Sequence, residues 1–287
     1  RYLVMGTVGA PFILIGIGLL YMMTGTLNME DLSHRLPDVA HTGAVKAGVG
    51  FILVGIAVKM ALFPVHMWLP STYHQAPIAV TAFLAGTATK VAVYLLMRFA
   101  LSVFGAAYSF ETLAIGAPIL LAGCGAALVG SLAAIHADDV KRVLAYSSLA
   151  QIGYMALGIG IATETGVAAS LLHMFNHALM KAALFMALGC VIWQMGGQSI
   201  RTFSGLGKTM PLTAVAWSVA AASLVGVPLT AGFISKWYLV LAALERGWWP
   251  LAALVMVTSL MAVVYMGKVL ERIWLGQPLE PTQHDKA

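Results

Sequence analysis

The sequence predicts an all-α polytopic membrane protein, and three observations support this prediction. Of the 287 residues, 60% are hydrophobic and only 9% are charged, whereas a soluble domain carries roughly a quarter charged residues. The mean hydropathy is +0.89. Long apolar runs recur along the chain, and they lack the alternation of apolar and polar residues that marks a membrane β-barrel. Water is therefore not the solvent for most of this surface.

The apolar runs predict about eight transmembrane helices, because about 20 residues cross a hydrocarbon layer near 30 Å thick. We expect spans near 2–24, 44–69, 78–104, 113–135, 143–163, 167–194, 211–243 and 248–270. Together they would form a single membrane domain, 1–287. The stretch Arg1–Gly25 lacks the charged segment and cleavage site of a signal peptide, and the sequence reads as a piece of a longer chain.

Two of these runs are expected to be broken helices. As one helix, 211–243 would be about 50 Å long, and it contains the segment GVPLTAG with Pro228 between two glycines. The segment FPVHMWLP likewise places Pro64 near the end of the second run. Interrupted membrane helices are tolerated where the freed backbone lines a polar cavity or is buried in protein. The breaks at Pro64 and Pro228 therefore predict an ion path, as in transporters.

Basic residues outside the apolar cores predict the orientation. Those on the side of the N-terminus outnumber those on the opposite side: Arg1, Lys141, Arg142, Arg201, Lys208, Lys268, Arg272 and Lys286 against Arg35, Lys46, Arg98 and Arg246. The positive-inside rule then places the N-terminal end in the cytoplasm, and we expect a bacterial or archaeal inner membrane. The net charge of +5 includes no basic run, which argues against nucleic-acid binding.

Four lysines lie inside apolar runs, where a charge is costly: Lys59, Lys90, Lys181 and Lys236. A lysine at the bilayer centre costs about 3 kcal/mol, and snorkelling to the membrane surface suits only residues nearer the helix ends. All eleven Asp and Glu residues fall in connections or at helix ends. Because burial without an anion disfavours the charged form of an amine, we interpret these lysines as proton-exchanging groups rather than members of salt bridges.

The sequence HMFNHALMK places three titratable residues on one face of the sixth run. His173, His177 and Lys181 follow one another at intervals of four residues. Two satisfied interhelical histidines are one alternative. A zinc pair is another, but the metalloprotease form HExxH is not met because Met174 follows His173. Since histidine changes charge between pH 5 and 8, we favour a titratable row.

Other motifs predict no catalytic residue, metal ligand or cofactor in this chain. Cys124 and Cys190 stand singly in apolar runs, without a CxxC or a haem-attachment motif. The segment GLGKT (205–209) lacks the first glycine of a phosphate-binding loop. We therefore expect no redox or hydrolytic site here.

Five segments resemble the proton-conducting antiporter-like membrane subunits: VKMALFPVHMWLPSTYHQAP, DDVKRVLAYSSLAQIGYM, LLHMFNHALMKAALFMALG, SGLGKTMP and GVPLTAGFISKW. That family includes the large antiporter-like subunits of respiratory complex I, subunits of membrane-bound hydrogenases and large subunits of Mrp-type sodium/proton antiporters. The resemblance implies a fold of about fourteen helices with two inverted five-helix repeats, each holding one broken helix. This chain would supply the sixth to thirteenth helices, with the start of the sixth in the cytoplasm.

The resemblance also implies roles for individual residues. Lys59 matches the lysine beside the seventh-helix break, Lys90 the eighth-helix lysine that passes protons centrally, and Lys236 the residue beside the twelfth-helix break. His173, His177 and Lys181 match polar positions of the eleventh helix. The fifth-helix glutamate that pairs with the seventh-helix lysine would precede Arg1. Segment 1–104 would end the first repeat, 113–270 would form the second, and 271–287 would be a polar tail.

These inferences together predict a proton-translocating subunit of a larger membrane complex, complex I-like or hydrogenase-like. The lysine at position 90 resembles the residue that one set of such subunits carries there. The His-His-Lys row resembles the corresponding residues of the quinone-distal subunit and of the hydrogenase relatives. A subunit of an Mrp-type sodium/proton antiporter without redox coupling is the alternative, and the buried lysines argue against a non-conducting scaffold. The expected partners are other membrane subunits, the lipid bilayer and protons, or sodium in the alternative. Quinone or hydrogenase chemistry would reside in other subunits.

Overall fold

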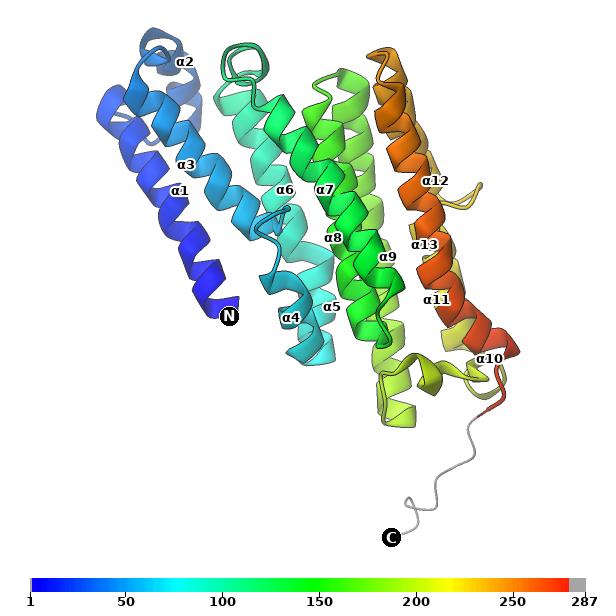
Figure 1. Ribbon diagram of the computed structural model, residues 1–287. Coiled ribbons are helices and arrows are strands. Elements are labelled where there is room, and N and C mark those ends of the chain that lie inside the picture. The colour runs from blue at the N-terminus through cyan, green and yellow to red at the C-terminus, as the bar shows by residue number, and fades with distance from the viewer. Residues whose placement is uncertain (1, 279–287) are drawn as a thin grey trace.

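A computed structural model describes residues 2–278, which form a bundle of long helices lying side by side (Figure 1). Seven helical segments of this part of the chain are long and apolar enough to cross a membrane: Gly6–Thr24, Gly43–Met60, Ile78–Val103, Gly116–Ile135, Val140–Gly160, Glu164–Met195 and Trp249–Leu275. Two half-helices of 15 residues each, α11 (Pro211–Val225) and α12 (Ala231–Glu245), lie between the sixth and the seventh of these segments. The predicted all-α membrane fold is confirmed.

The elements follow the predicted runs closely. In chain order the others are α1 (Tyr2–Thr24), α2 (Met29–Val39), α3 (Gly43–Met60), α4 (Trp68–Gln75), α5 (Ile78–Phe83), the π-helix η1 (Leu84–Ala88), α6 (Thr89–Met97), the π-helices η2 (Arg98–Val103) and η3 (Tyr108–Thr112), α7 (Gly116–Ile135), α8 (Val140–Gly160), α9 (Glu164–Met195), the 3₁₀ helix η4 (Ile200–Phe203), α10 (Leu206–Thr209) and α13 (Trp249–Leu275). Helices α5, η1, α6 and η2 are continuous and form one span.

Glycines allow two helix pairs to pack with their backbones close together. A Cβ added to Gly123 of α7 would lie 3.0 Å from the carbonyl oxygen of Gly153 on α8. A Cβ added to Gly16 of α1 would lie 2.6 Å from the carbonyl oxygen of Gly48 on α3. Small residues permit this close approach in membrane bundles. Larger side chains at these positions would push the helices apart.

Helix α8 runs through the interior of the bundle. All of its residues are buried except Arg142, which is exposed, and Tyr146, which is half-buried. It nevertheless carries several polar side chains: Lys141, Ser147, Ser148, Gln151 and Tyr154. Because buried polar groups require hydrogen-bond partners, α8 must face other polar groups inside the bundle.

The first broken helix consists of α3 and α4. Helix α3 ends at Met60, and Ala61 adopts a left-handed conformation with a φ of 57°. The indole N–H of Trp68, at the start of α4, donates to the carbonyl oxygen of Val58 at 2.8 Å. This bond satisfies a carbonyl group near the C-terminal end of α3. Pro64 lies in the turn between the two helices.

The second broken helix consists of α11 and α12, joined by residues 226–230. Gly226 has a φ of +89°, and its N–H donates to the carbonyl oxygen of Ala222 at 3.0 Å. A Cβ on Gly232 would lie 1.7 Å from the carbonyl oxygen of Ser223, so only glycine fits there. Pro228 lies within the connection, and Figure 1 shows this connection at the edge of the bundle between its two ends.

Candidate functional site

One face of α9 carries three buried titratable side chains. His173 is 2% exposed, and His177 and Lys181 are 0% exposed. The rings of His173 and His177 stack with their centroids 6.1 Å apart and their planes inclined by 3°. Because residues four apart lie above one another on a helix, the three side chains form a row inside the bundle. We call it the α9 row.

The amine of Lys181 lies between α9 and α8. Its Nζ donates to the carbonyl oxygen of Leu144 at 2.8 Å and to the hydroxyl oxygen of Ser147 at 2.5 Å. Both partners are neutral groups of α8. An ammonium group has three donors, so the charged form of Lys181 retains one N–H beyond these two bonds.

One amide and one hydroxyl group hold the ring of His173. Its Nε2 lies 2.9 Å from Oε1 of Gln151, and its Nδ1 lies 2.9 Å from Oγ of Ser235. With Nε2–H donating to Gln151, a neutral ring accepts a hydrogen bond at Nδ1 from the Ser235 hydroxyl. That hydroxyl also lies 3.1 Å from the carbonyl oxygen of Gly232, to which it can donate instead. Rotation of one hydroxyl therefore accommodates both the neutral and the protonated imidazole.

The ring of His177 lies between these two anchored groups. Both of its nitrogens are buried, and neither has a hydrogen-bond partner among the described residues. An unsatisfied buried polar group costs about 1–3 kcal/mol, and such groups are normally satisfied by buried water. We therefore expect water at the ring nitrogens of His177.

The amine of Lys236 lies at the second helix break and is 6% exposed. Its Nζ donates to the carbonyl oxygens of Leu224 at 3.0 Å and Val225 at 2.8 Å, the last carbonyls of α11. A helix C-terminus carries a partial negative charge, which stabilises a cation. The ring of Tyr154 lies 5.1 Å from Nζ, within the range of a cation–π interaction. The break thus creates an anchoring site for an amine without a carboxylate.

Lys90 lies directly after the π-helix η1 and is 6% exposed. Its Nζ donates to the carbonyl oxygen of Ala85 and, at 3.4 Å, to the hydroxyl of Thr89. Helix η1 contacts α9. π-helical turns occur frequently at functional sites, and this one brings a third buried amine to the α9 row.

Lys59 lies apart from these residues and differs from the expectation of a buried lysine. It occupies the last turn of α3 and is exposed. Helix α1 packs beside it, since a Cβ added to Gly9 would lie 3.4 Å from its Cγ. Figure 1 shows α1 and α3 together at one edge of the bundle. Within residues 2–278, Lys59 forms no ion pair with a carboxylate.

Sequence reasoning missed the neutral partners of these groups. Ser147, Gln151 and Tyr154 of α8 each contact a different member of the constellation, and Ser235 anchors His173 from α12. The polar letters of the segment YSSLAQIGY within an apolar run were the available signal. Among the described residues, no cluster of three or more His, Cys, Asp or Glu side chains could hold a metal ion.

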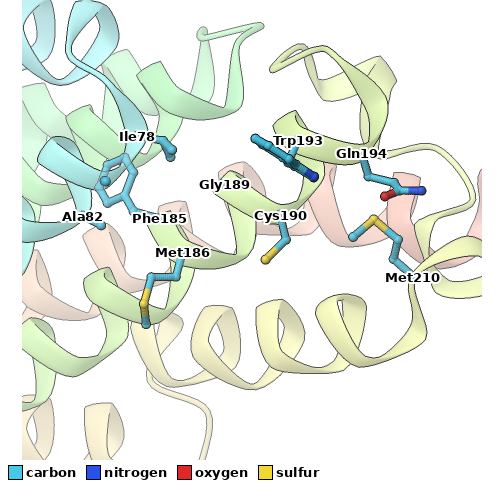
Figure 2. Close-up of a pocket in the computed structure, with 10 residues that line it drawn as sticks. Ile78, Ala82, Phe185, Met186, Gly189, Cys190, Trp193, Gln194 and Met210 are labelled. Carbon is cyan, nitrogen blue, oxygen red and sulfur yellow. The ribbon is translucent and has the colours of Figure 1, made fainter. Parts of the chain in front are cut away.

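A separate apolar groove lies further along α9, beyond Lys181. It has a volume of about 480 Å³ and is lined mainly by α5 and α9, including Ile78, Ala82, Phe185, Cys190 and Trp193 (Figure 2). No buried lysine or histidine lines it. Along α9, the titratable row is therefore followed by an apolar groove in the second half of the helix.

A helical membrane bundle with two broken helices and buried amines is typical of ion-translocating membrane proteins. This chain belongs to the transmembrane family described as NADH:quinone oxidoreductase/Mrp antiporter, whose model matches residues 1–262. It is 44% identical over 276 residues to NADH-quinone oxidoreductase subunit N of Desulforudis audaxviator, covering 96% of this chain and 54% of that protein. It is 33% identical over 277 residues to a Na(+)/H(+) antiporter subunit of Alkalihalophilus pseudofirmus, covering 96% of this chain and 55% of that protein.

The fold agrees with a solved structure from the same group of proteins. A chain of the membrane-bound sulfane sulfur reductase, an archaeal respiratory membrane complex, matches with a TM-score of 0.89 and 34% identity over 98% of this chain and 58% of that chain. The predicted family is confirmed, and the protein is an integral membrane protein with several spans. The chain spans about half the length of the curated relatives that it matches.

Proposed function

We propose that this chain is part of a proton-translocating subunit of a multisubunit membrane complex, complex I-like or hydrogenase-like. Lys90, His173, His177, Lys181 and Lys236 relay the protons. One observation carries the proposal: three amines and two imidazoles are buried together, and within residues 2–278 none of them pairs with a carboxylate. The hydrogen-bond partners of Lys90, His173, Lys181 and Lys236 are carbonyl, hydroxyl and amide groups. An anion would strongly favour the protonated form of these side chains, and neutral partners favour it much less.

The relay follows the order of contacts. Lys181 exchanges a proton with His177 through water. His177 in turn exchanges a proton with His173, and the rings of these two histidines are stacked. Ser235 and Tyr154 connect His173 to Lys236, since Ser235 binds His173, and Tyr154 contacts both the His173 ring at 5.6 Å and Lys236. Lys90 joins the relay from α6, which contacts α9 together with η1. Each step crosses only one helix turn or one helix interface.

We also propose a proton-exchanging role for Lys59, and this role rests on the family resemblance. In that family the seventh-helix lysine pairs with a fifth-helix glutamate, and an opposite charge close by favours the charged amine. The exposed position of Lys59 leaves its amine accessible to such a carboxylate. We propose that Lys59 exchanges protons with another part of the complete protein rather than directly with the α9 row.

The setting of the subunit is part of the proposal. Because the similar solved structure is a chain of a multisubunit complex, we propose that other membrane subunits are the partners and supply any redox cofactor. The basic residues support a cytoplasmic N-terminal end in a bacterial or archaeal inner membrane. A second candidate is a subunit of a sodium/proton antiporter, which the 33% identity to the Alkalihalophilus pseudofirmus antiporter protein favours.

Replacing His177 by Gln tests this function in the complete complex, purified and reconstituted into vesicles. Gln fills similar space but does not titrate, so we expect proton translocation to slow by about tenfold or more. The measurement is the change of a pH-sensitive dye, driven first by the redox substrate and then by a sodium gradient. Transport under the first driving force supports the main proposal, and transport under the second alone supports the antiporter.

A matched control is His136→Gln, because His136 is an exposed histidine at the end of α7. This variant should transport protons like the unaltered complex. If His177→Gln also transported like the unaltered complex, His177 would not be a relay residue.

A further inference from the structure

A fourth buried lysine lies at one end of the constellation. Lys141 is only 5% exposed, although the sequence placed it among the basic residues outside the apolar cores. Its Nζ donates at 2.5 Å to the carbonyl oxygen of Ala76, the residue that ends half-helix α4. The C-terminal end of α4 thus holds the amine of Lys141 in the way that the end of α11 holds that of Lys236.

On its inner side, Lys141 is one helix turn from the α9 row. The carbonyl oxygen of Leu144, three residues further along α8, accepts the hydrogen bond from Lys181. The hydroxyl groups of Ser147 and Ser148 donate to the same carbonyl at 3.0 and 2.9 Å. Three residues of an α-helix rise about 4.5 Å, so the backbone of Lys141 lies one turn of α8 from the carbonyl group that binds Lys181.

On its outer side, Lys141 adjoins a pair of partly exposed titratable groups. Nδ1 of His74 on α4 lies 3.6 Å from a carboxylate oxygen of Asp139, and their side chains are 25% and 21% exposed. Asp139 is also the N-cap of α8, accepting a hydrogen bond from the backbone N–H of Arg142 at 3.0 Å. The titratable and charged groups around Lys141 are therefore His74, two residues before Ala76, Asp139, two residues before Lys141, and, one turn along α8, Lys181 from α9.

We propose that Lys141 is the outermost proton-exchanging residue of this path and connects the aqueous side, at His74 and Asp139, to Lys181. A proton leaves the partly exposed His74–Asp139 pair, protonates the Lys141 amine and moves along the Ser147 and Ser148 hydroxyls to the Lys181 amine. Each transfer forms one N–H or O–H bond and breaks another, so no further reactant is needed. This inference rests on the proposed function.

The test uses the complete complex in vesicles and separates proton exchange from the anchoring of α4. Lys141→Arg and Lys141→Gln both keep an N–H donor for the Ala76 carbonyl, but neither releases a proton near neutral pH. We expect both variants to assemble normally and to translocate protons about tenfold or more slowly. Lys141→His, which retains a titratable group, should restore part of the lost rate. The matched control Arg142→Gln, at the exposed neighbouring position, should leave the rate unchanged.

The reference variant Lys181→Met separates failure of this inference from failure of the proposed function. If Lys181→Met slows transport while Lys141→Arg and Lys141→Gln transport like the unaltered complex, Lys141 only anchors α4 and the inference is wrong. If either Lys141→Arg or Lys141→Gln fails to assemble, the transport rate of the other variant tests the inference. If the unaltered complex moves no protons, or Lys181→Met has no effect, the proposed function is wrong and the inference falls with it.

Discussion

Replacing Lys181 by Met in the complete complex is expected to abolish most proton translocation while the complex still assembles. The amine is 0% exposed and its partners are the Leu144 carbonyl and the Ser147 hydroxyl. Ser147 donates to Leu144 by itself at 3.0 Å, so this carbonyl stays satisfied without Lys181. Exchanging a buried charge for an apolar side chain of similar volume is often tolerated. The loss should therefore be one of proton transfer, of about a hundredfold.

The measurement is the initial rate of acidification or alkalinisation inside vesicles, together with the amount of assembled complex. Lys181→Arg should fail as well, because a guanidinium group does not release its proton. The control is Lys208→Met, since Lys208 is exposed on α10. Normal transport by Lys181→Arg would show that a fixed positive charge is sufficient and that Lys181 exchanges no proton.

The second large effect is expected for Lys236→Met, which should lower both transport and stability. This change leaves the last carbonyls of α11, at Leu224 and Val225, without the amine that binds them. Each buried unsatisfied group costs about 1–3 kcal/mol. We therefore expect a lower unfolding temperature of the subunit and a proton flux reduced by about tenfold or more. Thermal unfolding and vesicle transport measure the two effects separately.

Lys236→Arg distinguishes the two roles, since Arg retains donors for both carbonyls but holds its proton. It should recover much of the lost stability and little of the transport. A matched control is Trp237→Phe at the neighbouring exposed position of α12, which should change neither. Full transport by Lys236→Arg would assign Lys236 a structural role at the helix break alone.

The fold was predictable because it depends on composition and on a few backbone constraints. Apolar runs longer than about 20 residues are stable in the hydrocarbon core of a membrane. There, a helix satisfies the hydrogen bonds of every backbone N–H and C=O group within the segment. Pro64 and Pro228 lack a backbone N–H, and both lie between half-helices as expected. The continuous π-helix η1 before Lys90 could not be anticipated, because LAGTA contains no residue that excludes an ordinary α-helical turn.

The site was predictable only for its charged and imidazole groups. A buried lysine such as Lys181 is costly enough to be conspicuous in an apolar run, whereas the hydroxyl of Ser147 or the amide of Gln151 is not. Lys59 and Lys141 were misjudged for a related reason. The burial of each depends on segments distant in sequence, since the end of α4 binds the amine of Lys141, whereas Lys59 stays exposed although α1 packs beside it. The inversion of the two repeats and their boundaries stay predictions.

The central claim is that protons move along a hydrated row of amines and imidazoles, and His177 tests it most directly. The decisive measurement is a cryo-electron microscopy map of the complete complex at a resolution that shows ordered water. We predict a water molecule within hydrogen-bonding distance of each ring nitrogen of His177, connected towards Lys181 on one side and His173 on the other. A ring enclosed by apolar side chains, with no water at either nitrogen, would contradict the claim.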